Sequence, residues 1–425
     1  MPRAGNVPPP TLHLFKPPVC VIMEAAPPYP FHEEAFSMNI YLRRGREQRV
    51  LGGHPWVFRS DIEREDGAAD GLPVRVLTSA GRFLAMAVYN PRSQISLRIL
   101  SRRDEPIDAA FIRGRVRRAL DYRRRFADLN SCRLIFAESD GLPAVIADKF
   151  GEVIVLQILC LGMERFKGDI VDALVQELSP RGIYERNDVP VRELEGLSQQ
   201  TGLLFGEVPD RVEMQENGVR FLVDVKEGQK TGFFLDQKEN RAAIAPFVSG
   251  MRVLDCFTHT GSFALHAAHY GAAEVTGVDI SEHACACALE NARLNGVEDR
   301  VRFECANAFD FLRAHQTAKE QYDVVILDPP AFTKTRSAVE GALRGYKEIN
   351  LRGMKLTRDG GFFITCSCSQ HVTPDLFRGM LLDAQKDAHV QLRQIEWRTQ
   401  GRDHPILLAS PETQYLKCGI FQVFK

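Results

Sequence analysis

The sequence lacks the features of a membrane protein and of a disulfide-stabilised one. No apolar run in its 425 residues approaches the roughly 20 residues that a membrane-spanning helix needs. Its ten cysteines include no Cys-x-x-Cys pair and show no regular spacing, which argues against a disulfide framework and against a zinc site. We therefore expect a cytoplasmic protein with reduced thiols, no bound metal and no contact with a membrane.

An excess of charge of one sign is also missing. The formal net charge is only −1, so the chain has no global basic field that would attract nucleic acid, and any such surface must be local. The length predicts two or three domains. A hydrophobic content of 44% is enough to build packed cores, which excludes a wholly disordered protein.

Residues 1–37 have no helix or strand pattern. The proline clusters at Pro8–Pro10, Pro17–Pro18 and Pro27–Pro28 interrupt any helix or central strand. No basic region followed by a clean apolar segment, as in a signal peptide, is present. We predict a disordered leader, and the sequence leaves open whether Met1 or Met38 is the start.

Short apolar runs separated by Gly, Pro and Asn fill residues 38–110 and predict a small β-rich domain. The phrase from Arg46 to Phe58, which contains Gly-Gly-His-Pro-Trp-Val-Phe, resembles the opening of PUA domains in RNA-modifying enzymes. Guanidinium groups spread over such a domain can hold RNA phosphates without reading their sequence; the alternative is a solvated rim. The arginines concerned are Arg43, Arg44, Arg46, Arg49, Arg59, Arg82, Arg92, Arg98, Arg102 and Arg103.

Helix and strand patterns are mixed in residues 111–228, which predicts a small α+β middle domain. Apolar residues recur at helical spacing over residues 107–128, and five arginines elsewhere on that helix extend the basic face. The Glu-Ser-Asp-Gly-Leu-Pro phrase at residues 138–143 resembles the middle domain of the methyltransferase family described below. Further predicted elements are strands at Leu142–Asp148, Val153–Leu159 and Val219–Val225 and a helix at Lys167–Glu177.

In residues 229–425, strands alternate with helices, which predicts a doubly wound α/β domain. Within it, Arg252 to Ile280 has the pattern of a parallel βαβ unit with a glycine turn. Asp255 and Asp279 stand at the ends of its two strands, where such sheets bind ligands. A dinucleotide fold would need Gly-x-Gly-x-x-Gly. This turn has a single glycine, and its bulky side chains would block a pyrophosphate.

This spacing resembles the nucleoside-binding unit of class I S-adenosylmethionine methyltransferases, which have a Rossmann-like fold. The resemblance implies that Asp255 and the turn at Gly261 cradle the methionine part of the cofactor, with Phe257 of the same turn beside it. It also implies that Asp279 accepts hydrogen bonds from the ribose hydroxyls. Asn307 stands at the end of the third strand, where this fold receives the adenine amino group.

Two later strand ends carry the signal for the reaction. Asp328-Pro329-Pro330 follows an apolar run, and its prolines hold the acid on a rigid, extended backbone. Amino-methylating enzymes have an aromatic residue directly after such prolines, whereas here Ala331 comes first and Phe332 second. The motif therefore indicates a methyltransferase without naming the target atom.

The second strand end is Thr-Cys-Ser-Cys-Ser, with Cys366 and Cys368. Carbon-5 of a pyrimidine is a poor nucleophile until a thiolate adds to carbon-6. A cysteine with this role must be exposed and must have some thiolate character. The alternative is that both are small buried residues of the strand.

The order of these features resembles that of the bacterial large-subunit rRNA cytosine-C5 methyltransferases over residues 40–425. The resemblance places the nucleophile at Cys368, with Cys366 as a neighbour, and makes Asp328 contact the cytosine edge and the cofactor. The Lys-Thr-Gly-Phe-Phe-Leu-Asp-Gln segment at residues 230–237 would cover the cofactor, or else act as a domain hinge. Other RNA cytosine-C5 methyltransferases have a second cysteine at the position where this sequence has Ala331. The resemblance therefore does not extend to their cysteine-assisted product release.

The resemblance implies S-adenosylmethionine as cofactor and 23S rRNA as substrate, either naked or in an early assembly intermediate, and it leaves a homodimer open. One alternative is a guanine methyltransferase of the same fold, which ends this strand without a cysteine; Cys368 argues against it. The other is a non-catalytic RNA-binding protein on the same scaffold, and the intact Asp255, Asp279 and Asp328 argue against that.

Overall fold

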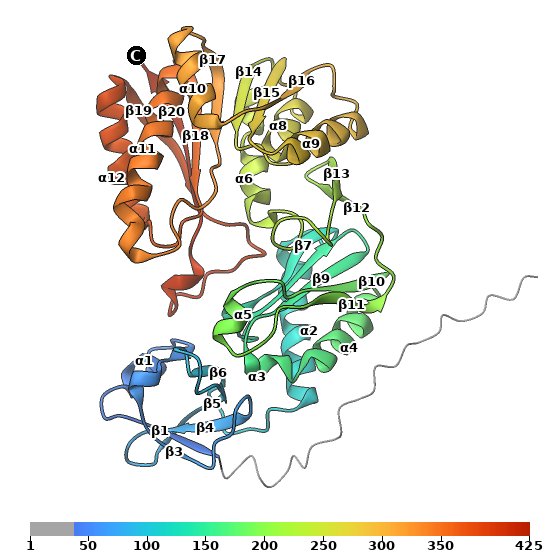
Figure 1. The fold of residues 1–425 in the computed structure, drawn as a ribbon, viewed down its shortest axis with the longest axis vertical. Coiled ribbons are helices and arrows are strands. Elements are labelled where there is room, and N and C mark those ends of the chain that lie inside the picture. The colour runs from blue at the N-terminus through green and yellow to red at the C-terminus, as the bar shows by residue number, and fades with distance from the viewer. Residues whose placement is uncertain (1–37) are drawn as a thin grey trace, which may run out of the picture.

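The computed structural model describes residues 38–425, so the predicted leader over residues 1–37 lies outside the described residues. The described chain is elongated, and three larger sheets follow one another along its long axis in chain order (Figure 1). The C-terminal sheet lies at the opposite end from the N-terminal one. None of the helices in this part of the chain combines the length and the apolar composition that a membrane crossing requires.

The N-terminal sheet has six strands in the order β2-β6-β5-β4-β1-β3. Its strands pair antiparallel except for β1 and β4, which are parallel. Alternating apolar side chains such as Ile40, Val74 and Leu97 fill its core, which confirms the predicted β-rich domain. The elements are β1 (Asn39–Leu42), α1 (Glu47–Leu51), β2 (Trp56–Val57), η2 (Arg59–Asp61), β3 (Ile62–Asp66), β4 (Pro73–Leu77), β5 (Phe83–Tyr89) and β6 (Leu97–Ser101).

A five-stranded sheet in the order β11-β10-β9-β8-β7 follows. Helix α2 begins where the Asp108 side chain accepts a hydrogen bond from the Phe111 N–H at 2.8 Å, and it buries Ile112, Val116 and Leu120. The elements are α2 (Ala109–Phe126), β7 (Ser131–Phe136), η3 (Ala137–Asp140), β8 (Val145–Phe150), β9 (Val153–Ile158), α3 (Leu161–Glu164), α4 (Lys167–Leu178), β10 (Gly182–Arg186), α5 (Val191–Leu194) and β11 (Thr201–Gly206).

A two-stranded hairpin, β12 (Val212–Glu216) and β13 (Val219–Val223), lies between the middle and C-terminal sheets. The sequence assigned it to the middle domain. Its alternating apolar residues, among them Met214 and Phe221, belong to the same buried cluster as Val253 and Phe263 of the C-terminal unit. The hairpin therefore contributes to the core beneath the C-terminal sheet.

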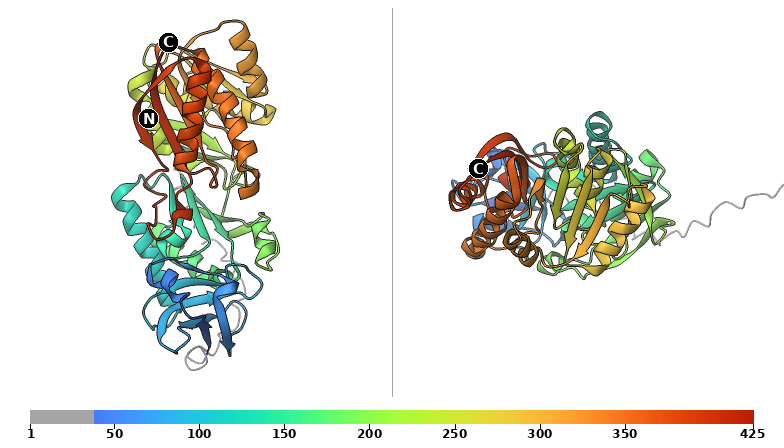
Figure 2. Two further views of the ribbon diagram at one scale, coloured as in Figure 1. Left: turned by 90° about the vertical axis from the view of Figure 1, so that its left-hand side faces the viewer. Right: turned by 90° about the horizontal axis from the view of Figure 1, so that it is seen from above.

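The C-terminal sheet has seven strands in the order β16-β15-β14-β17-β18-β20-β19, in which only β20 runs antiparallel to its neighbours. Helices lie on both faces (Figure 2): one core includes residues of α7 to α9 and the other residues of α10 to α12. This confirms the doubly wound α/β prediction. The strands are β14 (Arg252–Cys256), β15 (Glu274–Asp279), β16 (Val301–Cys305), β17 (Tyr322–Leu327), β18 (Thr357–Ser367), β19 (Gln391–Arg398) and β20 (Lys417–Phe424).

The strand order reverses between β14 and β17, which creates a switch point at the carboxyl ends of these strands. The surrounding helices are η4 (Leu235–Gln237), α6 (Lys238–Ala243), α7 (Ala245–Val248), α8 (Ser262–His269), α9 (Glu282–Leu294), α10 (Ala308–Thr317), η5 (Arg336–Ala338), α11 (Val339–Leu356), α12 (Pro374–Ala388) and η6 (Pro411–Thr413).

A long loop over residues 399–416, between β19 and β20, leaves the C-terminal sheet and reaches the N-terminal one (Figure 1). Its Glu412 lies 3.2 Å from His54 Nε2 and 3.5 Å from Arg49 Nη2. Burial and then the charge of Arg49 lower the pKa of His54. Gly53 has a φ of +103°, and a Cβ there would lie 2.8 Å from that of Ala409, so glycine is required where the loop docks.

Candidate active site

A cavity of about 320 Å³ lies at the switch point. It contains five of the seven residues that the sequence predicted for the site: Phe257, Asp279, Asn307, Asp328 and Cys368. The complete lining is Gln229, Lys230, Phe234, Asp236, Gln237, Phe257, His259, Ser262, Asp279, Ile280, Asn307, Ala308, Phe309, Asp328, Pro329, Pro330, Phe332, Cys368 and Leu416.

The other two predicted residues, Asp255 and Gly261, do not line this cavity but shape the turn beside it. Asp255 Oδ2 accepts hydrogen bonds from Thr258 Oγ1 at 2.5 Å and from the Ala264 N–H at 2.9 Å. Burial raises the pKa of Asp255 to about 7, although the hydrogen bond from Thr258 acts to lower it. The carboxyl group thus ties the turn to the first turn of α8.

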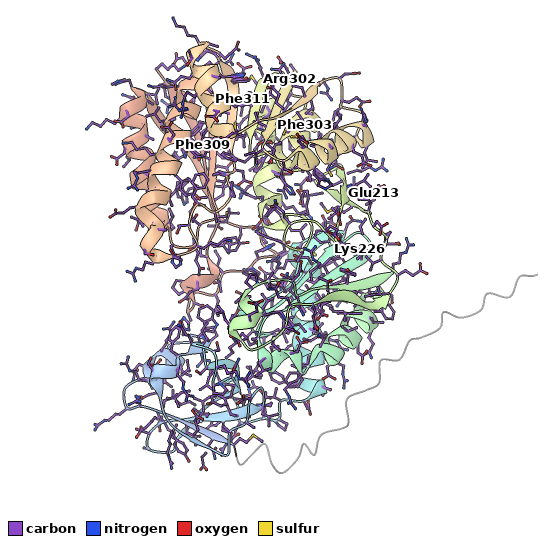
Figure 3. The ribbon with its side chains drawn as sticks, in the orientation of Figure 1. Glu213, Lys226, Arg302, Phe303, Phe309 and Phe311 are labelled. Atoms are coloured by element: carbon purple, nitrogen blue, oxygen red, sulfur yellow. The ribbon has the colours of Figure 1, made fainter. Side chains whose placement is uncertain are left out.

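Gly261 permits this turn because of its left-handed backbone. Its φ is +84°, and a Cβ would lie 3.0 Å from the Phe303 ring and 3.2 Å from Ala288. Phe257 and His259 also have positive φ values, +66° and +51°, which non-glycine residues adopt at a cost. Phe303 (labelled in Figure 3) comes from β16 and packs beneath the turn.

Backbone hydrogen bonds hold the two strained residues in place. The Phe257 N–H donates to the Val278 carbonyl at 2.8 Å, and the His259 N–H donates to Asp279 Oδ2 at 2.9 Å. Burial lowers the pKa of His259 to about 4, so its ring is neutral, and it stands edge-on to Phe234 with ring centroids 5.1 Å apart. The turn is therefore specified by its contacts with β15.

The cavity has the chemistry of a nucleoside site on the side of β15 and β16. Asp279 Oδ1 accepts from the Ser281 N–H at 3.0 Å, which fixes a carboxylate at the strand end. Asn307 caps α10 by accepting from the Phe309 N–H at 2.9 Å. Aromatic rings form the walls: those of Phe309 and Phe332 lie 5.9 Å apart, and each is 6.5 Å from Phe257. Phe309 is labelled in Figure 3. An apolar slot flanked by a carboxylate and a carboxamide suits a flat base and a ribose.

Asp328 stands on the opposite side, directly after β17. Its Oδ1 accepts a hydrogen bond from Gln237 Nε2 at 2.7 Å. Burial, and then the charge of Asp236, raise the pKa of Asp328 to about 6. This carboxyl group can accept or donate a hydrogen bond near neutral pH, as contact with a cytosine edge requires.

The structure separates the two cysteines of the Thr-Cys-Ser-Cys-Ser strand end. Cys366 is fully buried in β18, opposite Cys418 of β20, and it is absent from the cavity lining. Cys368 lies just beyond the strand, lines the cavity and has its Sγ 3.8 Å from the Pro329 carbonyl oxygen. Only Cys368 can meet a ligand in this cavity.

Burial and nearby charges act on the pKa of the Cys368 thiol, some raising it and others lowering it. Burial raises the pKa of Cys368 to about 11. The charges of Asp328 and Asp236 also raise this pKa, while Lys230 and Lys417 act in the opposite direction. Lys417 is buried and donates to the carbonyls of Ser369 and Tyr415, each at 2.8 Å. Burial lowers the pKa of Lys417 to about 8, and the charges of Cys368 and Cys366 oppose this. A thiolate formed at Cys368 would face the positive charges of Lys230 and Lys417 and the negative charges of Asp328 and Asp236.

Sequence reasoning missed Asp236 and Gln237, which line the cavity from η4. Although burial alone would raise the pKa of Asp236, Lys230, His404 and a 2.6 Å hydrogen bond from the Tyr415 hydroxyl hold it at about 2. The Leu-Asp-Gln end of the segment at residues 230–237 was the available signal. Within that segment, Lys230 reaches the cavity as expected.

Two other residues of the segment expected to cover the cofactor, Thr231 and Phe233, point elsewhere. Thr231 Oγ1 donates to Asp148 Oδ2 of the middle sheet at 2.6 Å. Phe233 is buried against Phe221, with ring centroids 4.9 Å apart. Within residues 38–425, no group of three or more His, Cys, Asp or Glu side chains is placed to hold a metal ion.

Two regions of the chain match models of known protein families. Residues 40–102 match the model of a PUA-like domain, and residues 198–399 match that of an S-adenosylmethionine-dependent methyltransferase. A Shewanella denitrificans protein named ribosomal RNA large subunit methyltransferase I is 41% identical over 396 residues, which are 91% of this chain and all of that protein. The chain belongs to the ribosomal RNA large subunit methyltransferase I family.

Further comparisons agree with this membership. A family member from Tolumonas auensis is 40% identical over 389 residues, covering 90% of this chain and 98% of its own. The crystal structure of SMU.776, assigned as a methyltransferase and complexed with SAH, superposes with a TM-score of 0.79 at 20% identity, over 90% of this chain and 99% of that one; this likeness shows the fold. The cofactor of this methyltransferase I family member is S-adenosylmethionine.

Asp279→Ala is expected to weaken S-adenosylmethionine binding by about 1.5–3 kcal/mol, because a charged acceptor at the end of β15 is lost. Calorimetric titration measures this effect. Glu274→Ala is the matched control, since Glu274 stands at the other end of the same strand and is 43% exposed. Wild-type affinity in Asp279→Ala would refute the ribose assignment.

Proposed function

We propose that the protein methylates carbon-5 of a cytosine in large-subunit (23S) rRNA through a covalent bond between Cys368 and the base. The observation that carries this proposal is the position of Cys368, which faces the cavity beside Asp328 while Cys366 is buried. The family names of the relatives, which refer to large-subunit rRNA, support the choice of substrate.

The residues divide the reaction between them. Asp255 and Gly261 shape the cofactor turn, Phe257 and Asn307 enclose the adenosine, and Asp279 receives the ribose. S-adenosylmethionine supplies the methyl group when it is bound. Asp328 and Cys368 line the side of the cavity where, in this proposal, the target base enters.

On that side, Asp328 hydrogen-bonds the cytosine edge while the Cys368 thiolate adds to carbon-6. The addition forms a carbon-6–sulfur bond and makes carbon-5 nucleophilic, so that it takes the methyl group and leaves S-adenosylhomocysteine. A water molecule acting as base then accepts the carbon-5 proton, the carbon-6–sulfur bond breaks, and the thiolate leaves with its electron pair as the aromatic ring is restored. Cys368 is the only cysteine in the described cavity lining. Release therefore proceeds without a second cysteine at Ala331.

The enclosed site constrains the substrate. A base must leave its stack to enter a cavity of about 320 Å³, which favours naked 23S rRNA or an early assembly intermediate in the cytoplasm. In this scheme residues 38–110 and 111–228 hold the RNA, and residues 229–425 carry out the transfer. A homodimer is compatible with it, and light scattering would determine the oligomeric state.

The test is product identification. The protein is incubated with methyl-labelled S-adenosylmethionine and protein-free 23S rRNA, and the RNA is digested to nucleosides. The proposal expects label in 5-methylcytidine. Label in a methylguanosine would favour the guanine methyltransferase alternative, and binding of RNA without any transfer would favour the non-catalytic one.

A further inference from the structure

A second cavity, of about 730 Å³, lies where the N-terminal sheet, α2 and the 399–416 loop meet. Four arginines line it: Arg102 and Arg103 follow β6, and Arg115 and Arg118 belong to α2. We call it the arginine cleft. Its full lining is Gly53, Pro55, Ile99, Leu100, Ser101, Arg102, Arg103, Glu105, Arg115, Arg118, Ala119, Tyr122, Glu138, Ser139, Asp140, Gly141, Pro405 and Leu407.

The acidic residues of the arginine cleft already have partners. Glu138 accepts hydrogen bonds from Trp56 Nε1 at 2.8 Å and from Arg98 at 3.1 Å. Asp140 pairs with the buried Arg123 at 2.5 Å. Glu105 accepts a hydrogen bond from the Ser101 hydroxyl. Glu138 and Asp140 therefore pair with Arg98 and Arg123, whereas the charge of Glu105 acts on Arg115 and offsets part of the positive charge of the four cleft arginines.

Positive charge in the cleft is consequently in excess. Arg102 and Arg115 donate to the backbone carbonyls of Val50 and Leu100, and neither Arg103 nor Arg118 forms a side-chain ion pair within residues 38–425. Burial, and then the charge of Arg118, lower the pKa of Arg115. Four crowded guanidinium groups that face the single carboxylate of Glu105 form a site for an anion.

Residues of two sequence motifs that do not line the catalytic cavity line this cleft instead. Gly53 and Pro55 come from the Gly-Gly-His-Pro-Trp phrase, and Gly141 ends the Glu-Ser-Asp-Gly phrase. Gly141 has a φ of +68°, and a Cβ there would lie 3.1 Å from Arg115 Nη1. Glycine thus lets the Arg115 guanidinium lie directly against η3, while Gly53 of the other motif accommodates the loop at Ala409.

One loop connects the arginine cleft with the catalytic cavity. Pro405 and Leu407 line the cleft, and Leu416 of the same loop lines the cavity that contains Cys368. The loop is fastened to α2, because the Tyr122 hydroxyl donates to the Arg402 carbonyl at 3.1 Å and Arg123 donates to the Asp403 carbonyl at 2.8 Å. The arginine cleft and the catalytic cavity therefore share this loop as part of their walls.

We propose that the arginine cleft binds the phosphodiester backbone of the RNA strand whose target nucleotide enters the catalytic cavity. This inference rests on the proposed function, because it takes the substrate to be RNA. Guanidinium groups from two different elements along an extended cleft match successive phosphates of one strand. They hold the strand without reading its sequence.

The test compares two double variants with the wild type. Arg103→Gln/Arg118→Gln removes two exposed charges of the cleft. Arg302→Gln/Arg393→Gln removes two exposed charges outside the regions proposed to hold the RNA: Arg302 is in β16 and Arg393 in β19, the two edge strands of the C-terminal sheet. The Arg302 side chain is labelled in Figure 3. Affinity for single-stranded 23S rRNA fragments is measured against salt concentration.

In the cleft variant we expect about tenfold weaker binding near 0.15 M salt and a salt slope smaller by about 1.4, since each single-strand phosphate contact contributes about 0.7. The KM for RNA should rise at unchanged kcat, with S-adenosylmethionine affinity preserved. The control variant should match the wild type. Equal losses in both double variants, or wild-type binding and slope in the cleft variant, would overturn the cleft assignment alone. Failure of the wild type to bind or methylate RNA would instead overturn the proposed function.

Discussion

Cys368→Ala is expected to reduce methyl transfer to RNA below about 10⁻⁴ of the wild-type kcat, because the variant cannot form the covalent bond that makes carbon-5 nucleophilic. Affinity for S-adenosylmethionine should stay close to that of the wild type, since the thiol acts on the base. Single-turnover transfer of labelled methyl and calorimetry of the cofactor measure the two quantities separately.

Cys366→Ala is the matched control for this prediction. Cys366 is fully buried opposite Cys418, so its removal leaves a small cavity in the core and costs about 1 kcal/mol of stability. Its kcat should be close to the wild-type value. Loss of transfer in Cys366→Ala together with retained transfer in Cys368→Ala would reverse the assignment of the nucleophile.

Glu216→Gln is expected to reduce the free energy of unfolding by about 3–5 kcal/mol, because it leaves the Arg241 guanidinium buried without a counter-ion. Arg241 Nε lies 2.6 Å from Glu216 Oε1, and both side chains are buried. Arg241 also donates to the Phe234 carbonyl at 2.7 Å, beside the segment that carries Gln237. Denaturant unfolding measures the change in the free energy of unfolding. The affinity for S-adenosylmethionine should fall as well.

The same hairpin strand provides the control. Glu213 (labelled in Figure 3) pairs with Arg220 at 2.7 Å, but the two side chains are 48% and 47% exposed. Because solvent screens this pair, Glu213→Gln should cost less than about 1 kcal/mol. Equal losses in the two variants would show that the buried pair has no special role.

The sequence predicted those parts of the site that lie at strand ends. Asp279 and Asp328 each follow an apolar run, and Asn307 follows the alternating strand Val301–Cys305. Parallel strands bring their carboxyl ends to one edge of the sheet. The choice of Cys368 over Cys366 came from the family pattern. The geometry gives it a physical reason, since the strand pairing buries Cys366 against Cys418.

Other parts depend on contacts between distant segments, which local patterns do not contain. Asp255 is an exception, because its Oδ2 accepts hydrogen bonds from the nearby Thr258 and Ala264; its expected contact with the cofactor stays a prediction. The positive φ of Phe257 is stabilised by a strand that lies about 20 residues away in sequence. The position of the 399–416 loop against the N-terminal sheet likewise rests on the long-range contacts of Glu412.

The most direct test of the central claim, the covalent bond between Cys368 and cytosine, is trapping with RNA that contains 5-fluorocytidine. Fluorine on carbon-5 blocks the final elimination, so the adduct survives denaturing electrophoresis. With S-adenosylmethionine present, we predict a protein–RNA band for the wild type and for Cys366→Ala, and none for Cys368→Ala. A band in Cys368→Ala, or no band in a wild type that still methylates unmodified RNA, would contradict the proposed mechanism.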